Sequence, residues 1–248
     1  MKNMFTFFKK HRPGPNLEIL TCDMHSHLIP GIDDGVPDLE TSLLLIRGLI
    51  DLGYKKLITT PHVNADSFRN TPAIIQEGRE DVIREIGRQG LSVEFQAAAE
   101  YLIDDGFTDN VSGPAVFLTL KENLVLVEFS FAVPAINLRK ILFDLQLKGY
   151  QPVLAHPERY LYFAGNKAWY DQLREIGCLF QLNLLSFSGH YGPEVRDLAQ
   201  FLVKKRYVEY LGTDMHHPGH LELLRHSSAV FKAVQQLADT GLLRNAAL

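Results

Sequence analysis

Histidine and carboxylate residues fall where short apolar segments of this sequence end. The first apolar segment runs into His25-Ser26-His27, and the last, at 208–214, runs into Asp214-Met215-His216. In a strand, side chains two residues apart point to the same face, so each pair can coordinate one metal ion. Imidazole nitrogens and carboxylate oxygens are ligands of zinc, manganese and iron. The two pairs therefore indicate a metal centre.

Further residues of ligand type stand at or just after the ends of the other apolar segments. They are His62, Glu100, Glu128 and His156. This placement of two pairs and four isolated residues favours a metal site over a coincidental distribution of these residue types. The turn-like sequence Asp33-Asp34-Gly35 offers one more carboxylate. Asp-Asp-Gly is also ordinary turn chemistry, and a turn that aims one of the two acids at the ions satisfies both interpretations.

An arginine accompanies this set, three residues after His156. The guanidinium of Arg159 is always charged and can make bidentate hydrogen bonds to phosphate oxygens. The alternative is a surface ion pair with Glu158. Beside a metal cluster, the phosphate-binding interpretation is favoured. His217 and His220 follow the last ligand pair and are expected to line the rim of the pocket rather than to bind metal.

The elements that must position these residues alternate between apolar and helical patterns. Strands are predicted at 19–24, 56–60, 92–100, 124–129, 152–156, 179–183 and 208–214, and helices at 38–52, 71–89, 134–147, 167–176, 193–205 and 221–240. Strands that are apolar nearly throughout indicate a parallel sheet covered on both faces. A closed (β/α) barrel, whose active site lies at the carboxyl ends of its strands, suits this length. An open doubly wound sheet is the alternative, but no GxGxxG follows the first strand.

The irregular segment 102–122 is interpreted as a long excursion that could act as a lid. Residues 1–18 are predicted to form an N-terminal tail, and residues 19–248 a single domain. The aromatic and basic residues 1–12 suggest a loosely ordered tail, with contact to a membrane surface as the alternative. The sequence does not indicate an oligomeric state.

Composition excludes several classes of protein. The 248 residues include 25 Lys+Arg and 29 Asp+Glu, a formal net charge of −4, so no basic excess argues for nucleic acid. Two cysteines without a CxxC motif suggest a reducing, cytoplasmic location. No apolar run approaches the roughly 18 residues of a transmembrane helix.

Together these residues resemble the PHP (polymerase and histidinol phosphatase) superfamily of metal-dependent phosphoesterases. The matching pieces, in the family's order, are DMHSH at 23–27, TPH at 60–62, Glu100, HPER at 156–159 and GTDMH at 212–216. The most similar branch is that of the capsule-type bacterial protein tyrosine phosphatases. It shares the HSHxxPGxDDG pattern at 25–35, the glutamate Glu128 where many other members have histidine, and QLN at 181–183.

This resemblance implies a distorted (β/α)7 TIM-like barrel with three divalent ions, most often manganese, with iron or zinc also used. The implied ligands are His25, His27, Asp34, His62, Glu100, Glu128, His156, Asp214 and His216. Asp34 is preferred over Asp33 because the family's ligand is the acid next to the glycine. Arg159 matches the phosphate-binding arginine, and His156 and Asp214 are counted with it as catalytic residues. Family members often have a second arginine after the final histidine, and His217 or His220 is expected to take over its contact.

The implied activity is hydrolysis of phosphotyrosine in a protein, through attack of a metal-bridging hydroxide at phosphorus. The implied partner is a bacterial tyrosine kinase of capsule or exopolysaccharide biosynthesis. Neither Cys22 nor Cys178 lies in a CxxxxxR loop, which argues against a phosphocysteine route. A small-molecule phosphatase of the histidinol-phosphatase type and a non-catalytic PHP regulatory module are the alternatives. The complete ligand set argues against the second of these.

Overall fold

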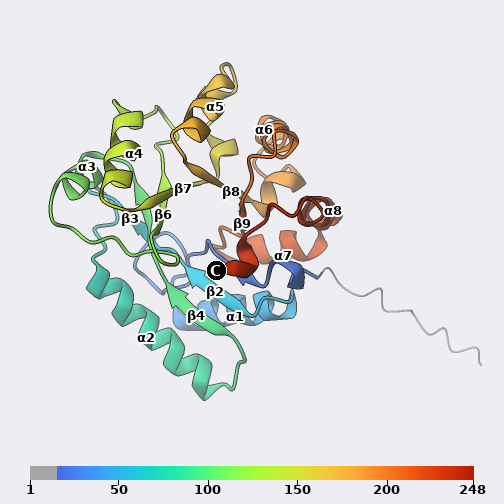
Figure 1. The fold of residues 1–248 in the computed structure, drawn as a ribbon. Coiled ribbons are helices and arrows are strands. Elements are labelled where there is room, and N and C mark those ends of the chain that lie inside the picture. Colours follow the sequence, from blue (N-terminus) through green and yellow to red (C-terminus); the bar gives the residue numbers. More distant parts are fainter. Residues whose placement is uncertain (1–15) are drawn as a thin grey trace, which may run out of the picture.

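A computed structural model describes residues 16–248, so the predictions for residues 1–15 lie outside it. Strands and helices alternate along the described chain (Figure 1). The strands are β1 (Cys22–Asp23), β2 (Lys56–Thr59), β3 (His62–Val63), β4 (Glu94–Ala97), β5 (Glu100–Leu102), β6 (Leu124–Glu128), β7 (Gln151–Ala155), β8 (Leu179–Asn183) and β9 (Tyr210–Gly212). Every pair of neighbouring strands is parallel. The prediction of an α/β fold with parallel strands is confirmed.

The strands form two sheets, with the orders β1-β2-β4 and β3-β5-β6-β7-β8-β9. Backbone hydrogen bonds from Ala98 N to Thr59 O (2.9 Å) and from Glu100 N to Pro61 O (3.1 Å) span the junction between the sheets. At the other margin, Ser26 bridges Met215, and Asp214 N donates to His25 O at 2.8 Å. The residues that follow β1 and β9 therefore lie side by side.

Helices connect most of these strands. They are α1 (Leu39–Asp51), α2 (Pro72–Arg88), α3 (Asp105–Ser112), α4 (Leu138–Leu147), α5 (Ala168–Glu175), α6 (Pro193–Lys204), α7 (Pro218–His226) and α8 (Ser228–Ala238). Short 3-10 helices are η1 (Glu18–Leu20), η2 (Pro157–Arg159), η3 (Leu161–Phe163), η4 (Leu184–Ser188) and η5 (Asn245–Ala247). As predicted, Thr71 caps α2, with Pro72 at its first position.

Several predicted elements have different bounds in the structure. The helix predicted at 221–240 is two helices, because the Ser227 side chain accepts a hydrogen bond from Val230 N and starts α8. The helix predicted from residue 134 begins only at Leu138, since Asn137 adopts a left-handed conformation (φ 61°). The strand predicted at 92–100 divides, and Glu100 opens β5 rather than ending the strand before it.

The strand predicted at 19–24 starts instead as η1, and only Cys22–Asp23 forms β1. Leu17, which precedes η1, is buried in the core. The irregular segment 102–122 contains α3, and its Phe107, Val111 and Phe117 are buried in the core. Much of this excursion is therefore packed structure. No helix within residues 16–248 is both long and apolar enough to cross a bilayer.

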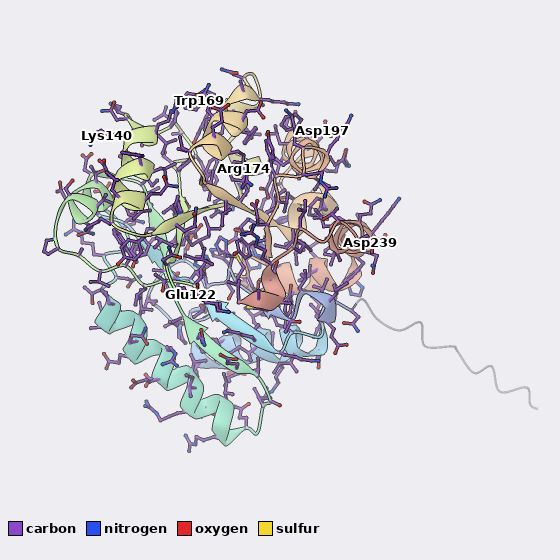
Figure 2. The ribbon with its side chains drawn as sticks, viewed as in Figure 1. Glu122, Lys140, Trp169, Arg174, Asp197 and Asp239 are labelled. Atoms are coloured by element: carbon purple, nitrogen blue, oxygen red, sulfur yellow. The ribbon has the colours of Figure 1, made fainter. Side chains whose placement is uncertain are left out.

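Two apolar cores support this frame. The larger one lies between strands and helices, and the smaller one includes Met24, Leu126 and Tyr210, with Leu248 packed against it. Figure 1 accordingly marks the C-terminus close to the strands. Arg174, labelled in Figure 2, lies on α5. It donates to both carboxylate oxygens of Glu209. Glu209 directly precedes β9. Its ion pair with Arg174 therefore stabilises the strand at the end opposite the predicted ligands.

Candidate metal centre

The nine predicted ligands converge from both sheets onto one cluster. Their ligand atoms form four overlapping groups, within each of which all atoms lie within 4.8 Å of one another. The groups are His27-Asp34-His62-His216, His25-His27-Glu100, His25-His156-Asp214 and His62-Glu100-Glu128. Together the groups contain every predicted ligand, and residues 16–248 form no other such group. The side chains singled out in the sequence therefore meet in one location, and their role as ligands stays a prediction.

Glu100 lies at the centre of the cluster and is fully buried. Its Oε2 atom lies 3.1 Å from His25 Nε2 and 3.3 Å from His62 Nδ1, and its Oε1 lies 3.0 Å from His156 Nε2. Burial alone would raise the pKa of this carboxyl group, but His25 and His62 outweigh burial and hold the pKa well below its usual range. Glu100 is thus an anion within reach of several imidazoles.

Two histidines are oriented so that their lone pairs face inward. His25 Nδ1 lies 2.7 Å from Gln181 Oε1, and His27 Nδ1 lies 2.8 Å from Asp33 Oδ2. Since both acceptors are oxygens, each Nδ1 donates its proton outward, which leaves a lone pair on each Nε2. The two Nε2 atoms lie only 3.3 Å apart in a buried site. Facing lone pairs at this distance need a proton or a cation between them, so this donor set fits a metal ion.

Other buried nitrogens also lack hydrogen-bond partners among residues 16–248. His62 Nδ1 lies 3.0 Å from Glu128 Oε1 yet makes no hydrogen bond of acceptable geometry, and His156 Nδ1 has no partner among the described residues. Burial lowers the pKa of His156 to about 4, which leaves a neutral imidazole. The carboxylates Glu100 and Asp214 overcome the effect of burial on His25 and raise its pKa to about 9. A bound cation would take the place of that proton.

The two neighbouring acids of the Asp33-Asp34-Gly35 turn have different surroundings. Asp34 Oδ1 lies 3.4 Å from His62 Nε2 and 3.6 Å from His216 Nε2, in the cluster. Asp33 lies behind His27, and its carboxylate also accepts hydrogen bonds from the backbone of Gly35 and His62. Burial would raise the Asp33 pKa, but these donors lower it to about 2. The turn therefore directs Asp34 toward the cluster, where its role as a ligand stays a prediction, and the orienting role of Asp33 was not predicted.

A chain of side-chain amides connects two predicted ligands through β8. Gln181 accepts from His25 Nδ1, its Nε2 donates to Asn183 Oδ1 (3.0 Å), and Asn183 Nδ2 donates to Asp214 Oδ2 (2.6 Å). Gln181 and Asn183 are fully buried and, being two residues apart, lie on one face of the strand. Each amide can make its hydrogen bonds in only one orientation here. The two amides therefore fix the tautomer of His25 and the orientation of Asp214 together.

Replacing Gln181 with methionine is expected to weaken metal binding by about 10- to 100-fold, the usual effect of removing an outer-shell partner. Methionine fills the space but cannot accept from His25 or donate to Asn183. Titration of the metal-free protein with Mn²⁺ in competition with a chelator measures the affinity. Gln200→Met, at an exposed position of α6, is the matched control. An unchanged affinity in the Gln181 variant would show that the amide chain does not position the ligands.

Arg159 stands beside the cluster, where the sequence predicts a phosphate contact. Its Nη1 donates to Asp214 Oδ2 at 2.9 Å, and its guanidinium carbon lies 4.6 Å from the ring centroid of Phe131 and 4.5 Å from that of Tyr191. The two rings flank the guanidinium and hold it in place. Both aromatic residues were missed in the sequence. Phe131 follows β6 closely, whereas Tyr191 lies beyond η4.

A cavity of about 330 Å³ opens onto this arrangement. It is lined by Asp34, His62, Glu128, Phe131, His156, Arg159, Tyr191, Asp214, His216, His217 and His220. His217 and His220 therefore lie at the pocket, as predicted. Burial, aided by His217, lowers the pKa of His220 to about 4, so this side chain is neutral. The segment 102–122 contributes nothing to this lining.

The chain is an α/β protein whose parallel strands bring histidine and carboxylate side chains into one buried cluster. This arrangement defines the class of α/β proteins with a multi-ligand candidate metal centre. The chain belongs to the CpsB/CapC family of capsular polysaccharide synthesis, which matches its residues 21–238. This match confirms the resemblance drawn from the sequence motifs.

One relative and two solved structures are similar to this chain in sequence or in fold. The tyrosine-protein phosphatase YwqE of Bacillus subtilis is 27% identical over 195 residues, which cover 79% of this chain and 77% of YwqE. A structure solved in a study of YwqE from Bacillus subtilis and CpsB from Streptococcus pneumoniae, described as unique metal-dependent tyrosine phosphatases, superimposes with a TM-score of 0.74. It is 26% identical and covers 90% of this chain and 94% of its own. The histidinol phosphate phosphatase of Lactococcus lactis, at 14% identity and a TM-score of 0.53, covers 93% of this chain and 94% of its own and shares the fold.

Proposed function

We propose that this protein is a metal-dependent protein tyrosine phosphatase. The observation that carries the proposal is the cluster of nine His, Asp and Glu side chains that shares one cavity with the guanidinium of Arg159. The tyrosine phosphatase named among its relatives, which the chain matches over most of its length, supports the same activity. The substrate class is a phosphotyrosine-containing protein.

The nine clustered residues are proposed to hold three divalent ions, with manganese first and iron or zinc as alternatives. The mixed nitrogen and oxygen donors suit these metals. When bound, such ions act as Lewis acids and make hydroxide available from coordinated water near neutral pH. The two sheets are proposed to form one closed seven-unit barrel within a single domain at 19–248. The bridge between Ser26 and Met215 supports this closure.

The protein's own groups would orient the phosphate. Arg159 keeps its charge at any physiological pH, and its contact with Asp214 leaves other guanidinium N–H groups free to donate to phosphate oxygens. Phe131 and Tyr191 hold the guanidinium plane by stacking on it. The neutral His217 and His220 complete the wall and are proposed substrate contacts. No protein nucleophile is required, and burial raises the pKa of both cysteine thiols, which disfavours their reactive thiolates.

The phosphorylated partner is proposed to be a bacterial tyrosine kinase of capsule or exopolysaccharide biosynthesis. Membership of the capsular polysaccharide synthesis family supports this assignment. A cytoplasmic location is proposed with it. The two free, buried cysteines, Cys22 and Cys178, are consistent with a reducing compartment.

The deciding experiment measures phosphate release from a phosphotyrosine peptide and from histidinol phosphate, with Mn²⁺ present. We expect a higher kcat/KM for the peptide, insensitivity to vanadate, and loss of activity after chelation. His156→Ala is expected to remove most of the activity. A higher kcat/KM for histidinol phosphate would support a small-molecule phosphatase instead. Absence of bound metal by elemental analysis, together with inactivity on both substrates, would support a regulatory module.

A further inference from the structure

The loop between β6 and α4 exposes apolar side chains beside the cavity. Phe131, Val133 and Ile136 are 50%, 64% and 87% exposed. No charged residue occurs between Glu128 and Arg139, so the loop itself is uncharged, and its Ile136 borders a second cavity that is also lined by Asp105 and Lys140. Exposed apolar groups that gather next to a functional cavity are a common mark of a binding surface.

Hydrogen bonds hold the base of this loop. Phe129 N donates to the hydroxyl of Tyr160 at 2.9 Å, and the hydroxyl of Tyr162 donates to Ser130 O at 3.1 Å. At the other end, Leu138 N donates to Ala135 O at 3.3 Å, and Pro134 restricts the backbone between the two ends. The apolar side chains are therefore presented to solvent by a loop that is fixed at both ends.

The loop is continuous with the cavity through Phe131. The ring of Phe131 stacks on His156 (centroids 5.6 Å apart) and on Arg159, while half of the residue stays exposed. A phosphotyrosine that reaches the metal centre is attached to a polypeptide, and that polypeptide must leave the cavity across its rim. From Phe131, which lines the cavity, the loop continues to the exposed side chains of Val133 and Ile136. We propose that loop 130–137 binds apolar side chains that flank the phosphotyrosine of the substrate protein.

Two other occupants suit this surface less well. An anionic membrane is held by clusters of lysine and arginine, and the ten residues from 129 to 138 carry no charge. A stable dimer buries about 800 Å² on each partner, and three side chains on one loop are too few to provide that area. The surface instead has the size of a contact for a few residues of an extended peptide. This inference rests on the proposed function and adds a source of selectivity for protein substrates.

The test compares two phosphotyrosine peptides that differ only in the two residues on each side of the phosphotyrosine, leucine in one and serine in the other. We expect the wild-type protein with Mn²⁺ to favour the leucine peptide about tenfold in kcat/KM, equivalent to about 1.4 kcal/mol. In the double variant Val133→Gln, Ile136→Gln this preference is expected to fall below about twofold. The kcat/KM for p-nitrophenyl phosphate, which does not reach the loop, is expected to stay within about twofold of wild type.

Leu44→Gln, at an exposed apolar position of α1, is the matched control and should keep the preference. Equal wild-type activity on both peptides, or a preference that survives in the double variant, would overturn the inference while leaving the phosphatase activity in place. Light scattering that shows a wild-type dimer and a monomeric double variant would overturn it in favour of self-association. Loss of vesicle binding in the double variant would overturn it in favour of a membrane. Failure of the wild-type protein to hydrolyse p-nitrophenyl phosphate would refute the proposed function itself.

Discussion

Replacing Glu100 with glutamine is expected to lower kcat/KM by more than about 10³-fold and to reduce the bound metal. Removing an outer-shell partner alone costs 10- to 100-fold, and Glu100 is central to the cluster. Its two oxygens lie within 3.5 Å of four imidazoles, those of His25, His27, His62 and His156. Glutamine has nearly the same shape, so the loss would come from the missing charge and from an amide group that faces the imidazoles.

The measurement pairs steady-state kinetics with metal content by elemental analysis. Glu94→Gln on the preceding strand, where the carboxylate is exposed, is the control and should keep both activity and metal. Circular dichroism would verify that both variants are folded. A Glu100→Gln protein with wild-type metal content and activity would contradict the placement of Glu100 among the ligands.

The types and positions of the candidate ligands were accessible from the sequence, because all of them except Asp34 follow or close an apolar segment. Parallel strands bring their carboxyl ends to one edge, so residues as distant as His25 and Asp214 could be expected to meet. The spacing alone did not separate Asp33 from Asp34. Burial separates them, since the backbone turn at Gly35 directs Asp33 behind His27 and leaves Asp34 partly exposed at the cavity.

The roles of the orienting and stacking residues could not be predicted, for a different reason, although QLN at 181–183 was already part of the resemblance. Gln181 and Asn183 act through hydrogen bonds to side chains from other strands, and a residue's own segment contains no trace of those partners. Phe131 and Tyr191 have the composition of ordinary core residues. Only the tertiary structure places their rings on the guanidinium of Arg159.

Element boundaries departed from the prediction where a single residue overrides the periodic pattern. Ser227 interrupts an otherwise continuous helical pattern, because its hydroxyl caps a new helix. Asn137, in a left-handed conformation, delays the start of α4 and leaves residues 130–137 as a loop. The second departure matters for function, since that loop carries the exposed side chains beside the cavity.

Replacing Arg159 with lysine is expected to lower kcat/KM for a phosphotyrosine peptide by about 10²-fold and to leave metal content within about twofold of wild type. Lysine keeps the positive charge but loses the planar fork, and with it the stacking on Phe131 and Tyr191. Asp214 stays oriented, because Asn183 Nδ2 still donates to its Oδ2 and its Oδ1 still lies 3.4 Å from His25 Nε2. This variant therefore separates phosphate binding from metal binding, whereas the Glu100 variant removes both.

Kinetics on the peptide and elemental analysis, performed on the same preparation, measure the two effects. Arg84→Lys, on the exposed face of α2, is the matched control and should behave as wild type. The loss should be as large for p-nitrophenyl phosphate as for the peptide, because Arg159 is proposed to contact the phosphate that both substrates share. A loss of kcat/KM confined to the peptide would instead show that Arg159 contacts the polypeptide around the phosphotyrosine. A loss of bound metal would show that Arg159 acts by positioning Asp214.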